Sequence, residues 1–261
     1  MNARELLREQ YKDGSNLNAR LTLHERFSTN RYGIFRWIFD RLKLPDTARV
    51  LELGTGTAQM WMQNADRVPR GWKIVLSDFS LGMLTESRSN LGSIERPFAM
   101  TQADAQALPF RDGIFDAVIA NYMLYHVPDV PLAMREVRRV LASGGACYAA
   151  TLGKEHLREL DAMVQRFFGV PRMSSAASHF GLENGGDLMR TSFPKVDVLR
   201  YRDGLIVTEA QPLIDYVNSS RVRAKAAAEQ VNALRQFIES ELATRGSIPI
   251  TKDAGMFIAT A

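Results

Sequence analysis

The sequence contains a single cysteine, Cys147, and no long apolar run. One cysteine cannot form an internal disulfide, which fits a reducing cytoplasm. No apolar stretch approaches the ~18 residues that suggest a membrane span. The first ten residues, MNARELLREQ, are polar and charged and lack the apolar core of a signal peptide. We therefore expect a cytoplasmic protein with no membrane partner.

Clusters of metal ligands and regions of strong charge are also missing. The four histidines lie far apart in the sequence, so we expect no metal site. The formal net charge is only +4 over 261 residues. The densest basic cluster, Arg135, Arg138 and Arg139, has the spacing of the outer face of one helix. A solvated helix face accounts for these arginines, and we expect no nucleic-acid partner.

The pattern that is present is that of an α/β domain. Apolar residues recur at helical spacing before Pro45, and Ser28, Thr29 and Asn30 offer a helix start inside that region. From Arg49 onward strands alternate with helices, which predicts a doubly wound, mostly parallel sheet. The expected strands are residues 49–53, 73–77, 98–102, 115–121, 146–151, 196–201 and 255–259.

The same pattern suggests a division of the chain. We expect an N-terminal helical cap or lid over residues 1–47 and an α/β domain over residues 48–261. We also expect an insertion on the substrate side of that domain, at about residues 154–194. A polar run from Tyr11 to Ser15 contains a glycine and resembles a hinge, so the cap is a candidate mobile lid. A permanently docked helical layer is the alternative.

The stretch V-L-E-L-G-T-G-T-A-Q-M-W, residues 50–61, joins the first strand to a helix. Gly54 and Gly56 allow a sharp turn and close approach of a ligand, and the following helix N-terminus favours anionic groups. A dinucleotide fingerprint would require glycine at position 59, which is Gln59. Glu52 instead places an acid two residues before the turn. A generic strand–helix turn remains the alternative.

Polar side chains end the next strands as well. Asp78 ends the second strand, where a carboxylate can accept hydrogen bonds from both hydroxyls of a ribose. Asp104 follows the third strand, where a carboxylate can accept from the exocyclic amine of an adenine. Asn121 ends the fourth strand. Each acid alone could be a turn or cap residue, but their ordered recurrence favours one nucleoside-binding edge.

These segments resemble the Rossmann-like S-adenosylmethionine-dependent methyltransferases, in particular the small-molecule branch related to ubiquinone/menaquinone methyltransferases. The resemblance covers about Val50 to Thr151 and rests on LELGTGTA, SDFSLGML, ADAQALPF, FDAVIANYMLYHVPD and REVRRVLASGG. It implies a seven-stranded sheet completed by a C-terminal antiparallel pair. The family normally has glycine where this chain has Ala58, which puts the fit of the methionine pocket in question.

The resemblance also implies site residues. Glu52, Gly54 and Gly56 are assigned to the methionine end of the cofactor, Asp78 to the ribose, and Asp104 to the adenine. The remaining assigned cofactor residues are Thr55, Phe79 and Met83, Ala105 through its backbone, Asn121 and Tyr122 near the sulfonium, and Tyr11 and Arg20 at the methionine carboxylate.

The expected reaction transfers a methyl group to an oxygen, nitrogen or carbon atom and releases S-adenosylhomocysteine. If a base is needed, His126, Tyr125 and His24 are the candidates, although simple packing is the favoured interpretation of His126. The sequence lacks the motifs of DNA-amino, cytosine-C5 and protein-arginine methyltransferases, so a small-molecule acceptor is expected. Peptide N-terminal or carboxyl methylation, nicotinamide-dependent oxidoreduction and non-catalytic cofactor binding are the alternatives. We expect a monomer or homodimer.

Overall fold

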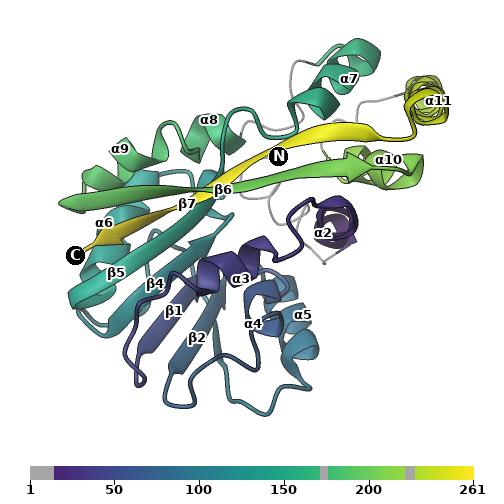
Figure 1. The fold of residues 1–261 in the computed structure, drawn as a ribbon. Helices are drawn as coiled ribbons and strands as arrows, with labels where there is room; N and C mark the ends of the chain where they lie inside the picture. The colour runs from purple at the N-terminus through teal and green to yellow at the C-terminus, as the bar shows by residue number, and fades with distance from the viewer. Residues whose placement is uncertain (1–14, 171–175, 221–226) are drawn as a thin grey trace.

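The protein has two lobes that share two long strands (Figure 1). The computed structural model describes residues 15–170, 176–220 and 227–261. The strands are β1 (Arg49–Leu53), β2 (Lys73–Asp78), β3 (Ala99–Gln102), β4 (Phe115–Asn121), β5 (Leu141–Leu152), β6 (Lys195–Val207) and β7 (Ile248–Thr260). The helices are α2 (Ser15–Phe27), α3 (Ile34–Phe39), α4 (Gln59–Met62), α5 (Leu81–Leu91), the 3₁₀ helix η1 (Leu124–His126), α6 (Val130–Val140), α7 (Arg158–Phe168), α8 (Ala176–Phe180), α9 (Gly185–Arg190), α10 (Ala210–Asn218) and α11 (Ala228–Arg245).

All seven strands form one sheet with the order β3-β2-β1-β4-β5-β7-β6. The strands from β3 to β5 are parallel to their neighbours, and β7 is antiparallel to both β5 and β6. The predicted doubly wound, mostly parallel Rossmann-like sheet with a C-terminal antiparallel pair is therefore confirmed. This order reverses direction beside β1, and a ligand crevice is expected at such a switch point.

The central strands are buried on both faces, which explains their nearly continuous apolar sequences. In β1, Val50 packs into one cluster with residues of α3 and α4, while Leu51 packs into the opposite cluster. That opposite cluster includes Val130, Met134 and the other inward-facing residues of α6. Asp129 caps α6 by accepting from the backbone N–H of Leu132 at 2.8 Å, as its sequence position predicts.

The second lobe is built around the far ends of β6 and β7, which run beyond the core into the region of α2, α7, α10 and α11 (Figure 1). Its apolar cluster, here called the cap cluster, consists of Leu23, Phe27, Leu157, Leu160, Val164, Leu205, Val207, Leu213, Ile214, Val217, Leu234, Ile238, Ile248 and Ile250. The described part of residues 1–47 divides between the lobes, because α2 packs into the cap cluster and α3 packs against the core. The cap lobe therefore combines segments from both ends of the chain.

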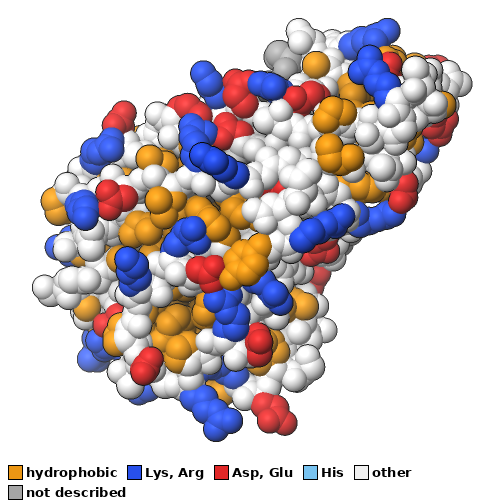
Figure 2. Space-filling view, viewed as in Figure 1, with side chains coloured by type: hydrophobic (Ala, Val, Ile, Leu, Met, Phe, Trp, Pro, Cys, Tyr) orange, Lys and Arg blue, Asp and Glu red, His pale blue; other side chains and the backbone are white. Residues whose placement is uncertain are grey.

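The surface carries charges of both signs. On the face shown in Figure 2, blue Lys and Arg side chains alternate with red Asp and Glu side chains. Among the described residues, no helix combines the length and apolarity needed to cross a bilayer. Many other polar residues line a cavity between the two lobes.

Candidate active site

A cavity of about 1080 Å³ lies between the carboxyl ends of the parallel strands and the cap lobe. This volume slightly exceeds the range for a single small-ligand site, which is ~300–1,000 Å³. Every predicted site residue in the described part of the chain lines it, namely Arg20, His24, Glu52, Gly54, Thr55, Gly56, Asp78, Phe79, Met83, Asp104, Ala105, Asn121, Tyr122, Tyr125 and His126. Tyr11 lies outside the described residues.

The turn after β1 uses three left-handed backbone positions. Gly54, Gly56 and Ala58 have φ values of 62°, 55° and 61°. The left-handed conformation of Ala58 accounts for the usual glycine at this place in the family, since a Cβ there adds ~1–2 kcal/mol of strain. Its methyl group is buried in the core cluster of α3 and α4. The structure thus accommodates the departure at the N-cap of α4.

Gly54 also has no room for a side chain. A Cβ at Gly54 would lie 2.6 Å from Cβ of Met123, whereas one at Gly113, with a similar φ of +65°, would meet no atom within 4 Å. We expect Gly113→Ala to cost ~1–2 kcal/mol of unfolding free energy from backbone strain alone. Gly54→Ala should cost ~1–3 kcal/mol more because of the steric clash. Urea denaturation of both variants tests this, and equal losses would contradict the packing role of Gly54.

Glu52 is a buried acid held by three donors. One of its oxygens accepts from Thr55 Oγ1 at 2.9 Å and from Trp61 Nε1 at 2.6 Å, and the other accepts from Asn121 Nδ2 at 3.0 Å. Burial raises the pKa of Glu52 to about 7, and the nearby Asp78 acts in the same direction. The hydrogen bonds oppose this rise but do not overcome it. Glu52 is therefore poised between its charged and neutral forms near neutral pH.

Asp78 connects the second strand to the glycine turn. Its carboxylate accepts from the backbone N–H of Gly56 at 3.0 Å and from that of Ser80 at 2.8 Å. Burial raises its pKa. The backbone N–H of Phe79 is a third donor to this carboxylate. A carboxylate offers about four lone-pair sites, so acceptor capacity remains for a ligand. Asp104 follows β3, and its Oδ1 accepts from the backbone and side-chain nitrogens of Gln106 at 2.9 and 3.0 Å.

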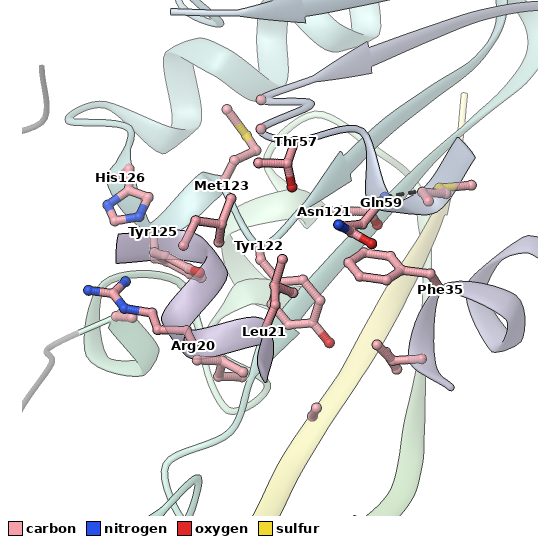
Figure 3. A pocket seen from close by; sticks show the side chains of 18 of the residues that line it. Arg20, Leu21, Phe35, Thr57, Gln59, Asn121, Tyr122, Met123, Tyr125 and His126 are labelled. Carbon is pink, nitrogen blue, oxygen red and sulfur yellow. Dashed lines mark hydrogen bonds between the residues drawn. The ribbon is translucent and has the colours of Figure 1, made fainter. Parts of the chain in front are cut away.

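The end of β4 presents an amide and a phenol. Tyr122 has a left-handed φ of 56°, and its ring meets that of Phe35 edge-on at 6.5 Å. Burial raises the pKa of Tyr122, which keeps its hydroxyl protonated. Figure 3 shows Tyr122 beside Leu21 and Phe35, with Asn121 on the Phe35 side. The middle of the cavity is therefore largely aromatic and apolar.

The predicted base candidates occupy different parts of the cavity. Tyr125 and His126 belong to η1, and their rings contact each other edge-on at 4.5 Å. In Figure 3 they lie with Arg20 on the side of the cavity away from Asn121. Arg20 donates to Oγ and to the backbone oxygen of Ser219 at 3.1 and 2.8 Å. His24 lies on α2, near the cap end.

Sequence reasoning missed part of the lining. His156, Tyr216 and Lys252 line the cavity from the cap lobe, and Phe35 and Leu21 line its middle. Nothing in the local sequence marks Lys252 as a site residue, so only the tertiary fold shows its place. Within the described ranges, no group of three or more His, Cys, Asp or Glu side chains is arranged to hold a metal ion.

Comparisons with known proteins agree with this architecture. Residues 51–149 match the family model described as a methyltransferase domain. A malonyl-[acyl-carrier protein] O-methyltransferase of Geobacter sulfurreducens is 36% identical over 136 residues, which cover 51% of this chain and 50% of the relative. The ubiquinone/menaquinone biosynthesis C-methyltransferase UbiE of Cellvibrio japonicus is 36% identical over 110 residues, covering 41% and 44%. The chain spans about half the length of the curated relatives it matches.

A solved structure shows the same fold over the whole chain. The phosphoethanolamine N-methyltransferase 2 of Haemonchus contortus, in complex with phosphomonomethylethanolamine and S-adenosylhomocysteine, superposes with a TM-score of 0.61 at 18% identity. The match covers 100% of this chain and 60% of that protein. Residues 51–149 are therefore similar to a methyltransferase domain, and the chain has the fold of a known methyltransferase.

Proposed function

We propose that the protein transfers the methyl group of S-adenosylmethionine to an oxygen, nitrogen or carbon atom of a small-molecule acceptor in the cytoplasm. One observation carries this proposal: a single cavity has two chemically different ends. Its strand end is acidic, with Glu52, Asp78 and Asp104, and suits a cationic nucleoside cofactor. Its cap end is formed by segments outside the matched family region and suits an acceptor.

The strand end fits the cofactor in its polar detail. Two buried side-chain atoms that line the cavity, Thr57 Oγ1 and Asn121 Oδ1, have no hydrogen-bond partner among the described residues. Buried polar atoms are rarely left unpaired, so these two indicate a polar ligand. Asp78 retains acceptor capacity for ribose hydroxyls, and Asp104 lies at the neighbouring strand end. The left-handed glycine turn brings the backbone close without a Cβ in the way.

The cofactor, when bound, supplies an electrophilic methyl group on a sulfonium. The chain's own contribution is to position the acceptor in line with that bond and to exclude water. Tyr122, Phe35 and Leu21 form an apolar wall beside Asn121, which is suited to both tasks. The phenol of Tyr122 keeps its proton and can donate a hydrogen bond to an acceptor. An acceptor that ionises by itself needs no further base.

The proposal is tested by ligand binding and product analysis. Calorimetry should show that S-adenosylhomocysteine binds to the full chain and that NADH does not. Incubation with S-adenosylmethionine and a panel of phenols, amines and carboxylic acids should yield S-adenosylhomocysteine, detected by mass spectrometry. Binding of NADH would favour an oxidoreductase. Cofactor binding without turnover of any acceptor would indicate a non-catalytic cofactor-binding protein, and turnover of peptide ends only would indicate a peptide methyltransferase. A monomeric or homodimeric state and the lack of nucleic-acid and membrane partners remain predictions.

We expect His126 to be dispensable as a base. His126 lies at the margin of the cavity beside Tyr125 (Figure 3). His126→Gln should therefore lower the turnover number by less than about tenfold, whereas loss of a general base typically costs ~10²–10⁴-fold. Steady-state kinetics with the identified acceptor measures this. A loss in the larger range, with S-adenosylhomocysteine affinity and melting temperature unchanged, would make His126 the base.

A further inference from the structure

A buried polar cluster occupies the cap end of the cavity. It consists of His24 on α2, His156 in the turn before α7, Lys252 on β7, and the supporting residues Asp203 on β6 and Ser28 after α2. All except Asp203 line the cavity. These residues are distant in sequence, and the structure brings them together where the long β6–β7 pair passes α2 (Figure 1).

The ammonium of Lys252 is held by Asp203 and Ser28. It forms a salt bridge with Asp203, and the exposed fractions of the two side chains are only 8% and 1%. It also donates to Ser28 Oγ at 2.7 Å, and Ser28 in turn donates to Asp203 at 2.8 Å. No third partner of the ammonium exists among the described residues. Since an ammonium has three protons, one donor remains for a ligand.

The two histidines add neutral polar atoms. Nδ1 of His156 accepts from the backbone N–H of Asp253 at 3.3 Å, which places the ring proton on Nε2. The ring of His24 lies 5.7 Å from that of His156, and its Nδ1 is buried without a partner in the described part of the chain. Burial lowers the pKa of both rings, that of His156 to about 4, so both are uncharged at neutral pH.

Helix α2 runs along the cavity from its cofactor end to this cluster. Leu17 lies against the glycine turn, because its Cδ2 would be 3.3 Å from a Cβ at Gly56. His24 follows seven residues later on the same face, about 10 Å further along the helix axis. Leu21 lies between them along the helix and, like Tyr122 and Phe35, lines the apolar middle of the cavity (Figure 3). The cluster is therefore about 10 Å from the glycine turn at the cofactor end.

The net charge of the cluster indicates which kind of ligand group it can bind. Lys252 is already compensated by Asp203, and the histidines are neutral. A buried carboxylate or phosphate would add a charge without a counterion, which is costly. An uncharged oxygen can accept from the spare donors without that cost. We propose, on the basis of the methyl-transfer function above, that His24, His156 and Lys252 bind a hydroxyl or carbonyl group at the far end of an elongated, largely apolar acceptor.

The test compares three probes of similar size, naphthalene, 2-naphthol and 2-naphthoate, by calorimetry on the full chain saturated with S-adenosylhomocysteine. 2-Naphthol should bind about three- to tenfold more tightly than naphthalene, the contribution of one net hydrogen bond. 2-Naphthoate should bind more weakly than 2-naphthol. His24→Leu and His156→Leu should each reduce the preference for 2-naphthol to less than twofold. His24→Gln, which retains hydrogen-bonding capacity, should keep most of it.

Lys195→Met removes an exposed lysine of β6 and serves as the control. It should change neither the affinity for S-adenosylhomocysteine nor the preference for 2-naphthol. S-Adenosylhomocysteine affinity should be the same in all variants, since the cluster lies away from the cofactor end. Equal binding of naphthalene and 2-naphthol, no binding of 2-naphthol, a preference for 2-naphthoate, or a preference that survives in both leucine variants would overturn the inference. If S-adenosylhomocysteine itself fails to bind, the proposed function fails first, which distinguishes the two results.

Discussion

Replacing Asp78 by asparagine should weaken S-adenosylhomocysteine binding by about a hundredfold. The ribose is expected to donate a hydrogen bond to this carboxylate, and a hydrogen bond to a charged group contributes ~1.5–3 kcal/mol. Asparagine keeps the volume and one acceptor oxygen but loses the charge and turns an NH₂ group toward the backbone N–H of Gly56 or Ser80. The variant therefore loses affinity for two reasons: its contacts with the ribose are weaker, and the hydrogen bonds that hold the glycine turn are disturbed.

Isothermal calorimetry of the purified variant measures the change, and Asp66→Asn on the exposed surface before β2 is the matched control. Urea denaturation without ligand separates the two causes. A variant that is less stable but binds the cofactor normally would show that Asp78 only supports the turn. Unchanged affinity and unchanged stability together would remove Asp78 from the site altogether.

The parts of this fold that sequence reasoning predicted are those with local causes. The strand at residues 49–53 and the strand at 115–121 have the predicted bounds, because buried apolar runs end at residues with a clear break in pattern. Likewise, Glu52, Asp78 and Asp104 could be selected because parallel strands place their carboxyl ends at one edge. Residue order along the chain was sufficient to assemble this edge.

The cap lobe has no such local cause. The predicted strands 196–201 and 255–259 are only parts of β6 (Lys195–Val207) and β7 (Ile248–Thr260). Their remaining halves contain Arg202, Asp203 and Lys252, which resemble loop residues until the two strands are paired with each other. The spacing of apolar residues along the chain does not reveal which strands pair when they are this far apart in the sequence.

The segment Ser28-Thr29-Asn30 illustrates the same limit. Its residue types predict the start of a helix, but α3 begins only at Ile34. The hydroxyls of Ser28 and Thr29 and the backbone N–H of Asn30 instead bond the carboxylate of Asp203. A capping residue and a tertiary hydrogen-bond donor have the same composition, and only the position of Asp203 decides between them.

Replacing Glu52 by glutamine should change stability and cofactor affinity in opposite directions. Burial raises the pKa of Glu52 to about 7 in the folded protein, compared with an ordinary value of 4.5. The folded state therefore holds this proton more tightly than the unfolded state does. The stability that results is complete below pH 4.5 and is lost as the pH rises through 7, where the acid must ionise in the interior. A difference of about 2.5 pKa units corresponds to ~3 kcal/mol.

Glutamine copies the shape of the neutral acid and does not ionise. Its oxygen can accept from Thr55 and Trp61 as Glu52 does. Its amide can donate to Asn121 after rotation of that side chain, since Asn121 Oδ1 lacks a partner among the described residues. At pH 8 we therefore expect Glu52→Gln to raise the free energy of unfolding by up to ~3 kcal/mol. At pH 4.5 the variant and the native protein should be almost equally stable.

Affinity for S-adenosylmethionine should move the other way, because the ligand carries a net positive charge and the carboxylate at the cofactor end attracts it. Loss of that charge should weaken binding ~10²-fold at pH 8, where the native acid is ionised. In the native protein, affinity should rise with pH through about 7 as Glu52 loses its proton. This rise should vanish in Glu52→Gln and persist in the control Glu229→Gln, an exposed acid on α11. Urea denaturation and calorimetry at pH 4.5, 6, 7 and 8 measure both quantities. A variant that loses stability at pH 8, or binds the cofactor as tightly as the native protein there, would mean that Glu52 is a structural acid whose charge the cofactor does not sense.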